Sequence, residues 1–320
     1  MKVLVTGGTG FIGKYLVNEL LENSYDVVVF TRRKNFEMDG VETKYGDITD
    51  YKSIYRACRN VDAVFHNAAL ARDWGKWGEF YRINVEGTKN VAEACIENGI
   101  SHIIYTSSAG VYGFPNTEEW ITEESQEKPL NAYHKSKLMG EKVLQGYDNI
   151  IASMIRPPLV LGAGGNATRI ILSGIEKGRM VYVGDGNQHI SIVHPSDVAQ
   201  CLRLCLEKDE GGNIFNVVSF VCRIKELFEE IAREMGVEKV RKHIPYSIAY
   251  ISAWISEKLS REPSITRFRV KSLGTTRRID CQKAMNLLGY KPRYDLEKTV
   301  EEMVSWYRAK VRRDFITPST

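Results

Sequence analysis

The chain has 320 residues, of which 43% are hydrophobic and 26% are charged, the composition of an ordinary globular protein with one or two domains. Its 44 basic and 40 acidic residues are interspersed and give a formal net charge of +4, so no nucleic-acid partner is expected. No apolar run reaches transmembrane length, a strand pattern begins at residue 2, and the six cysteines form no C-x-x-C pair, which together predict a cytoplasmic protein without signal peptide, membrane partner or metal site.

The first predicted strand, at 3–5, turns at once into a glycine-rich loop and then into a helical apolar pattern. The glycines follow the spacing G-x-x-G-x-x-G, and a helix N-terminus behind such a loop offers free N–H groups to a pyrophosphate. A tight structural turn is the alternative for the glycines alone, but the strand–loop–helix context favours dinucleotide binding. The residues expected to bind the cofactor here are Gly7, Gly10, Phe11, Ile12 and Gly13.

Strand and helix patterns alternate through the first half of the chain. Strands are predicted at 27–30, 41–45, 63–66, 102–108 and 150–155, and helices at 50–58, 79–98 and 131–146. This alternation predicts an α/β protein of the Rossmann type, with a doubly wound parallel sheet. We expect a dinucleotide-binding domain of residues 1–160 and 190–218, and a smaller, mostly helical substrate domain of residues 161–189 and 219–320.

The end of the second strand bears on which dinucleotide is bound. Thr31 stands where an acidic residue would bind the ribose of NAD, and Arg32 and Arg33 follow. Guanidinium groups suit the 2′-phosphate of NADP, so NADP is preferred to NAD, although a solvated basic turn would look the same. Asp47 and Ile48, after the third strand, are expected to meet the adenine, with helix capping as the alternative for Asp47.

A tyrosine and a lysine four residues apart carry the predicted chemistry. Tyr133 and Lys137 share one face of a helix, where an ammonium and an oxidised nicotinamide would lower the tyrosine pKa from its usual ~10. The phenol could then move a proton while the nicotinamide moves a hydride. A surface pair is the alternative. Ser107 and Ser108 end a strand above the expected cofactor site.

Motifs along nearly the whole chain resemble those of the extended short-chain dehydrogenases/reductases, the NAD-dependent epimerase/dehydratase superfamily. They are TGGTGFIG, GDITD, FHNAA, NVEGTKNV, SSAGVYG, YHKSK, HPSDVA and KAMNLLGYKP. The resemblance implies that Tyr133 is the general acid/base, that Lys137 binds ribose and tunes the tyrosine, and that Ser108 binds the substrate oxygen. It also implies that Asn84 supports the lysine, with helix capping as the alternative, and that Ala68, Ala69 and Pro157 line the cofactor groove.

Departures from the family pattern indicate the branch. Thr106 is followed by serines rather than the acidic residue of sugar dehydratases. Ile190 stands where sugar-nucleotide epimerases usually have a diphosphate-binding arginine, and only Arg269 is a candidate for their second arginine. The tail from 262 is similar to that of dihydroflavonol-reductase-like and 3β-hydroxysteroid-dehydrogenase-like members. We therefore predict an NAD(P)-dependent oxidoreductase for a secondary alcohol or ketone. The alternatives are a nucleotide-sugar C4 epimerase with tightly bound NAD, and a non-catalytic NADP-sensing protein.

Aromatic residues suggest further contacts. Trp74 and Trp77 follow the fourth strand and either form a wall for a small-molecule substrate or anchor the next helix. The amphipathic stretch 247–259 is interpreted as packing within the substrate domain rather than binding a membrane. A homodimer is expected.

Overall fold

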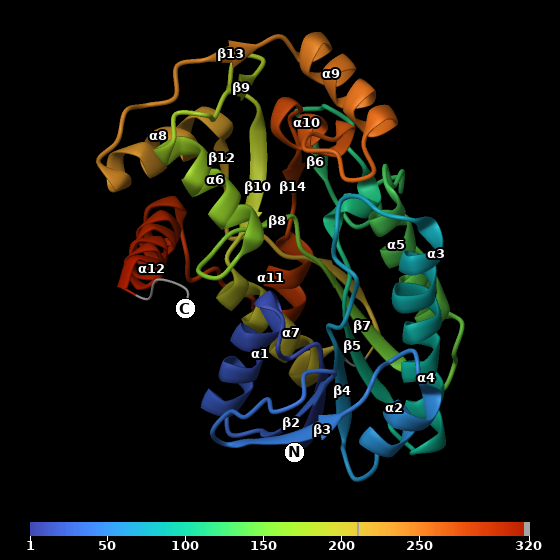
Figure 1. The fold of residues 1–320 in the computed structure, drawn as a ribbon. Helices are drawn as coiled ribbons and strands as arrows, with labels where there is room; N and C mark the ends of the chain where they lie inside the picture. The colour runs from blue at the N-terminus through green and yellow to red at the C-terminus, as the bar shows by residue number, and fades with distance from the viewer. Residues whose placement is uncertain (210, 317–320) are drawn as a thin grey trace.

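A seven-stranded parallel sheet forms the lower half of the molecule (Figure 1). The computed structural model describes residues 1–209 and 211–316, with side chains up to residue 310. The strand order is β11-β7-β5-β4-β1-β2-β3, and every neighbouring pair is parallel. The strands are β1 (Lys2–Thr6), β2 (Asp26–Thr31), β3 (Val41–Tyr45), β4 (Ala63–His66), β5 (His102–Thr106), β7 (Ile151–Arg156) and β11 (Ile214–Asn216). The doubly wound α/β fold is thereby confirmed.

Both faces of this sheet are covered by helices, which explains the continuous apolar runs of its strands. Successive side chains of a strand point to opposite faces. Val3 and Val5 thus pack with α1 (Phe11–Glu22), α7 (Pro195–Lys208) and α11 (Gln282–Leu288). Leu4 packs on the other face with α2 (Tyr51–Ala57), α4 (Gly87–Glu97) and α5 (Ala132–Gln145).

The predicted helix at 79–98 is divided into three segments. They are α3 (Trp77–Phe80), a π-helical segment (Tyr81–Glu86) and α4. The other two predicted helices and all predicted strands occur within about two residues of their predicted bounds, the scatter expected at element ends.

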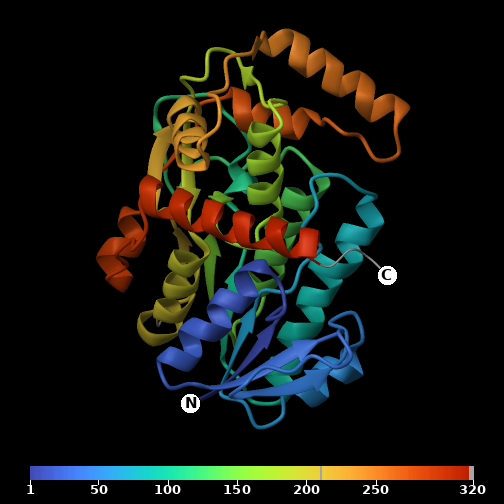
Figure 2. The same ribbon diagram turned by 60° about the vertical axis from the view of Figure 1, so that its left-hand side comes forward.

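Smaller sheets and helices form the upper half of the molecule. The strands are β8 (Leu159–Val160), β10 (His189–Val193) and β12 (Phe220–Arg223) in one sheet, β9 (Tyr182–Val183) with β13 (His243–Ile244), and β6 (Trp120–Ile121) with β14 (Arg278–Ile279). The helices are α6 (Asn166–Glu176), α8 (Ile224–Met235), α9 (Tyr246–Leu259), α10 (Arg267–Gly274) and α12 (Leu296–Ile316). Figure 2 shows α12 crossing the front of the molecule, where its buried face packs with residues of α6 and α8. β10 falls within the range 190–218 expected in the dinucleotide-binding domain, yet it pairs with β8 and β12 rather than with the large sheet. The division into two domains stays a prediction.

The stretch 247–259 differs from its interpretation as a packed amphipathic segment. Only Ala249 and Ala253 of α9 are buried, in a small cluster with Val183 and Val270. Five large apolar side chains of the helix are exposed: Ile248, Ile251, Trp254, Ile255 and Leu259. Among the described residues, no helix combines the length and the apolar character needed to cross a membrane.

Candidate active site

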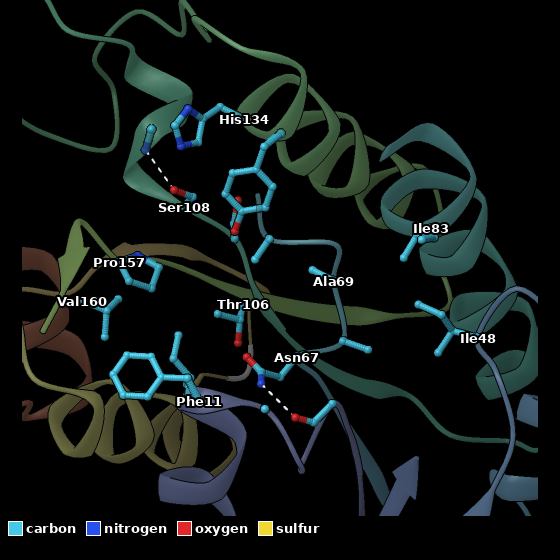
Figure 3. Close-up of a pocket in the computed structure, with 18 of the residues that line it drawn as sticks. Phe11, Ile48, Asn67, Ala69, Ile83, Thr106, Ser108, His134, Pro157 and Val160 are labelled. Atoms are coloured by element: carbon cyan, nitrogen blue, oxygen red, sulfur yellow. Dashed lines mark hydrogen bonds between the residues drawn. The ribbon is translucent and has the colours of Figure 1, made fainter. Parts of the chain in front are cut away.

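A cavity of about 580 Å³ opens at the carboxyl ends of the parallel strands. This is where ligands bind in doubly wound sheets, beside the point at which the strand order reverses, here at β1. The loops after β1, β2, β3, β4, β5 and β7 all contribute to its lining. Figure 3 shows Ile48 and Ile83 on one side of the cavity and Pro157 and Val160 on the other. Of the predicted cofactor residues, only Gly13 and Lys137 do not line it.

The glycine loop leaves room for a ligand beside the start of α1. Gly7 has φ +72°, and a Cβ there would lie 2.7 Å from the backbone nitrogen of Ala68. A Cβ on Gly13 would overlap the carbonyl oxygen of Gly7, so Gly13 lets the helix pack against the turn. Within the described structure no side chain caps α1. The N–H groups of its first turn therefore remain available for a pyrophosphate, and the residues present fit a dinucleotide.

The two arginines and Asp47 lie together at one end of the cavity. Arg32 is 73% exposed, and its Nη1 is 3.5 Å from Asp47 Oδ2. Arg33 donates its backbone N–H to Thr31 Oγ1 at 3.1 Å, which fixes the turn. Burial acts to raise the pKa of Asp47, but hydrogen bonds from Thr49 and the Arg32 charge outweigh it and lower that pKa. Asp50 caps α2, so helix capping does not account for Asp47.

Ser108 and Tyr133 line the middle of the cavity. The Ser108 hydroxyl accepts the backbone N–H of Gly110 at 3.1 Å and caps the short 3-10 helix Ala109–Tyr112. The neighbouring Ser107 instead donates to Glu141, which also receives two hydrogen bonds from the buried Arg156. The Ser107 hydroxyl is therefore committed to a structural network, and Ser108 keeps its hydroxyl at the cavity.

Lys137 does not line the cavity. Its side chain is 1% exposed, and Nζ lies 3.9 Å from the ring centroid of Tyr105. Burial lowers the pKa of Lys137 to about 7, an effect that the charge of Glu141 opposes. Burial raises the pKa of Tyr133 to about 12. The lowered tyrosine pKa expected from the sequence requires an oxidised nicotinamide beside the phenol, and it stays a prediction.

Asn84 binds the backbone and a serine rather than the lysine. Its side chain accepts from the N–H of Leu70 at 2.7 Å and donates to the carbonyl of Leu70 and to Ser136 Oγ. It lies inside the π-helical segment, so it does not cap a helix. Asn84 thus joins the loop after β4 to α5, next to Tyr133 and Lys137.

Three residues singled out in the sequence lie away from the cavity. Trp74 donates Nε1 to the carbonyl of Arg261 at 3.1 Å and borders a separate, smaller pocket. Trp74 therefore anchors its loop instead of lining the main cavity. Arg269 is paired with Asp73 at 2.6 Å, and Ile190 is buried in β10. Neither of the two expected epimerase positions offers a free cation to the cavity.

Several residues of the lining were not predicted. The cavity extends past Tyr133 to Phe114, His134, Phe268, Ser272 and Arg277. Most of these come from segments far apart in the sequence, and of the five only His134 lies within a motif quoted above, YHKSK. The one signal was an arginine pair in TTRRID, where charged residues interrupt a strand-like stretch.

The comparison with family models decides the family. The model of the NAD dependent epimerase/dehydratase family matches residues 3–218. The chain belongs to this family. Membership confirms the resemblance found in the sequence, and it makes the protein an enzyme of an NAD-dependent family.

Matches to individual relatives extend beyond residues 3–218 and cover nearly the whole chain. The mouse (Mus musculus) sterol-4-alpha-carboxylate 3-dehydrogenase, decarboxylating, is 30% identical over 98% of this chain and 92% of its own. The 2-alkyl-3-oxoalkanoate reductase of Stenotrophomonas maltophilia is 30% identical over 95% of this chain and 98% of its own. An undecaprenyl-diphosphate-linked N-acetylglucosamine 4-epimerase of Escherichia coli O157:H7 is 25% identical over 98% of each. The crystal structure of gox2253 superposes with a TM-score of 0.83 at 28% identity, covering 97% of this chain and 98% of that one.

Proposed function

We propose that this epimerase/dehydratase-family enzyme is an NAD(P)-dependent oxidoreductase that interconverts a secondary alcohol and a ketone. The observation that carries the proposal is the placement of the Ser108 hydroxyl and the Tyr133 phenol in the cavity that the glycine loop opens. The names of two relatives support it, since both describe oxidation or reduction at carbon 3 of a carboxylate-bearing molecule.

The chain's own residues perform the proton transfer. In the proposed reaction, the Tyr133 phenol donates its proton to the ketone oxygen, or takes the proton from the alcohol in the reverse direction. The Ser108 hydroxyl donates a hydrogen bond to the same oxygen and orients the substrate. The nicotinamide, when bound, supplies or accepts the hydride. Lys137 keeps its proposed role as a ribose ligand, and Asn84 positions its helix through Ser136.

NADP is the proposed cofactor. Arg32 and Arg33 both line the cavity, at the end of β2 where the adenosine ribose is bound in this fold. Arg32 is held loosely by Asp47 at 3.5 Å, so its guanidinium can still reach a 2′-phosphate. The enzyme is further proposed to be a homodimer. It is also proposed to work in the cytoplasm, because all six of its cysteines are free thiols, as expected in a reducing compartment.

The proposal is tested with Tyr133→Phe. This variant should lose at least about a hundredfold in kcat, because general acid–base catalysis contributes on the order of 10²–10⁴-fold, and should bind NADP as the wild type does. The readouts are nicotinamide absorbance during turnover of a ketone panel, and fluorescence titration of the cofactor. Tyr81→Phe, on the exposed part of the π-helical segment, is the matched control. Wild-type turnover in the Tyr133 variant contradicts the assignment.

A further inference from the structure

A buried arginine with no carboxylate partner borders the cavity beyond the proposed catalytic residues. Arg277 is 8% exposed and lies just before β14. Its Nη1 donates to the carbonyl of Gly113 at 3.3 Å, and its guanidinium lies over the ring of Phe114. Among the described residues no acidic side chain forms an ion pair with it, whereas the adjacent Arg278 pairs with Glu118. A guanidinium has five N–H donors, so most of those of Arg277 remain for a ligand.

The charge of Arg277 is uncompensated as well as buried. Burial alone lowers the pKa of Arg277 to about 10, and no anion raises it. Burial, followed by the charge of Arg277, lowers the pKa of His134 to about 3. His134 lies between Tyr133 and Arg277. Its ring centroid is 5.1 Å from that of Tyr133, and its Nδ1 has no hydrogen-bond partner in the structure. A buried ion without a partner is costly, so a ligand that supplies an anion there gains binding energy.

The surroundings of this cation are aromatic. Phe114 and Phe268 make an edge-to-face pair with centroids 5.6 Å apart, and Phe268 lies 5.2 Å from the His134 ring. All of these line the same cavity as Ser108 and Tyr133. Gly113 directly follows the four-residue 3-10 helix that Ser108 caps, and such a helix is about 8 Å long. The Ser108 hydroxyl and the Arg277 guanidinium, which contacts Gly113, therefore lie within reach of one small substrate molecule.

We propose that Arg277 binds the carboxylate of the substrate, which is then an organic acid with an apolar chain whose acid group lies a few bonds from the reacting alcohol carbon. The inference rests on the proposed function. It gives the part of the cavity beyond Tyr133 one cation, Arg277, and aromatic walls, which suit one carboxylate and a hydrocarbon. A diphosphate bears two negative charges, and the two positions expected to hold it are the buried Ile190 and the paired Arg269.

The test measures binding and turnover separately. Octanoate and methyl octanoate are titrated against the NADP complex of the wild type, and 3-hydroxyoctanoate and its methyl ester are used for turnover. The wild type should bind octanoate on the order of 10- to 100-fold more tightly than the ester, as expected for hydrogen bonds to a charged group. Arg277→Met should abolish this preference, Arg277→Lys should keep part of it, and the control Arg278→Met should keep all of it.

Stability and a competing ligand complete the test. Arg277→Met should not lower the melting temperature, because it removes an unpaired buried charge. A lower melting temperature with unchanged acid preference would mean that Arg277 only holds the Gly113 carbonyl, and would overturn the inference. So would equal binding of acid and ester by the wild type, or UDP-glucose binding that depends on Arg277 and exceeds that of octanoate. The binding arm is decided without hydride transfer, so it can fail while the Tyr133 experiment succeeds, and the reverse.

Discussion

In the proposed function, two arginines, Arg32 and Arg33, give the enzyme its preference for NADP over NAD. We expect the double variant Arg32→Ala, Arg33→Ala to weaken NADP binding roughly 10- to 100-fold and to change NAD binding by less than about threefold, because only NADP carries the 2′-phosphate. Lys34→Ala is the matched control, since Lys34 is exposed but does not line the cavity. Isothermal titration of both cofactors against the three proteins measures this. A wild type that binds NAD more tightly than NADP would contradict the preference at once.

The two serines after β5 show what a residue's position in the sequence can and cannot reveal. Their place at the end of a strand predicted that they would lie over the cofactor site, and Ser108 does line the cavity. That Ser107 donates to Glu141, which Arg156 holds in turn, depends on residues of α5 and β7 that lie more than thirty positions further along the chain. Arg277 was missed for the same reason, because its exposure to the cavity comes from packing between distant segments.

At the scale of elements, α9 is the part of the chain that sequence pattern described least well. Its apolar residues recur at helical intervals and so indicated a packed face. In the structure two buried alanines, with the partly buried Tyr246 and Tyr250, make the contact, while the isoleucines, Trp254 and Leu259 face outward. Periodicity identifies an apolar stripe, but it does not say which stripe packs.

This arrangement predicts that changing a large apolar side chain of α9 affects stability less than changing one of its buried alanines. Ile251→Ser should change the free energy of unfolding by no more than about 0.5 kcal/mol, because the side chain is 57% exposed. Ala253→Leu should cost about 1–3 kcal/mol, because Ala253 is fully buried and the larger side chain overpacks the cluster. Urea unfolding of both variants measures the two values. A larger loss for Ile251→Ser would show that the outward face is covered in solution.

At the scale of the whole molecule, alternating strands and helices were enough to predict the sheet and its direction. Each buried parallel strand has a continuous apolar run and each covering helix an apolar stripe, so local pattern and final fold agree. The upper half has strands of two to five residues that pair across distant segments, as β14 does with β6, and these carry too little local signal. The part of the cavity built by that half, from Phe114 to Arg277, was correspondingly unforeseen.

Two buried histidines make the folded molecule sensitive to acid. His66 and His134 are buried, and burial, followed by the charges of Lys137 and Arg277 respectively, lowers the pKa of each to about 3. In the unfolded chain each titrates near 6.5. Between these values the unfolded state holds more protons than the folded state, so the free energy of unfolding must fall as the pH falls. The loss begins near pH 6.5 and reaches up to about 1.4 kcal/mol per pH unit for each histidine.

His66→Gln isolates one of these two contributions. Glutamine can keep hydrogen bonds to Thr6 and Thr88, which His66 contacts at 2.8 and 2.9 Å, but it does not titrate. Urea unfolding at a series of pH values between about 6.5 and 5 should therefore give a slope shallower than the wild type's by roughly 1 kcal/mol per pH unit. His102→Gln, at a partly exposed position bonded to Ser101, is the control and should keep the wild-type slope. If the His66 variant lost stability with acid as steeply as the wild type, the ring of His66 would have to bind its proton in the folded protein as readily as in the unfolded chain.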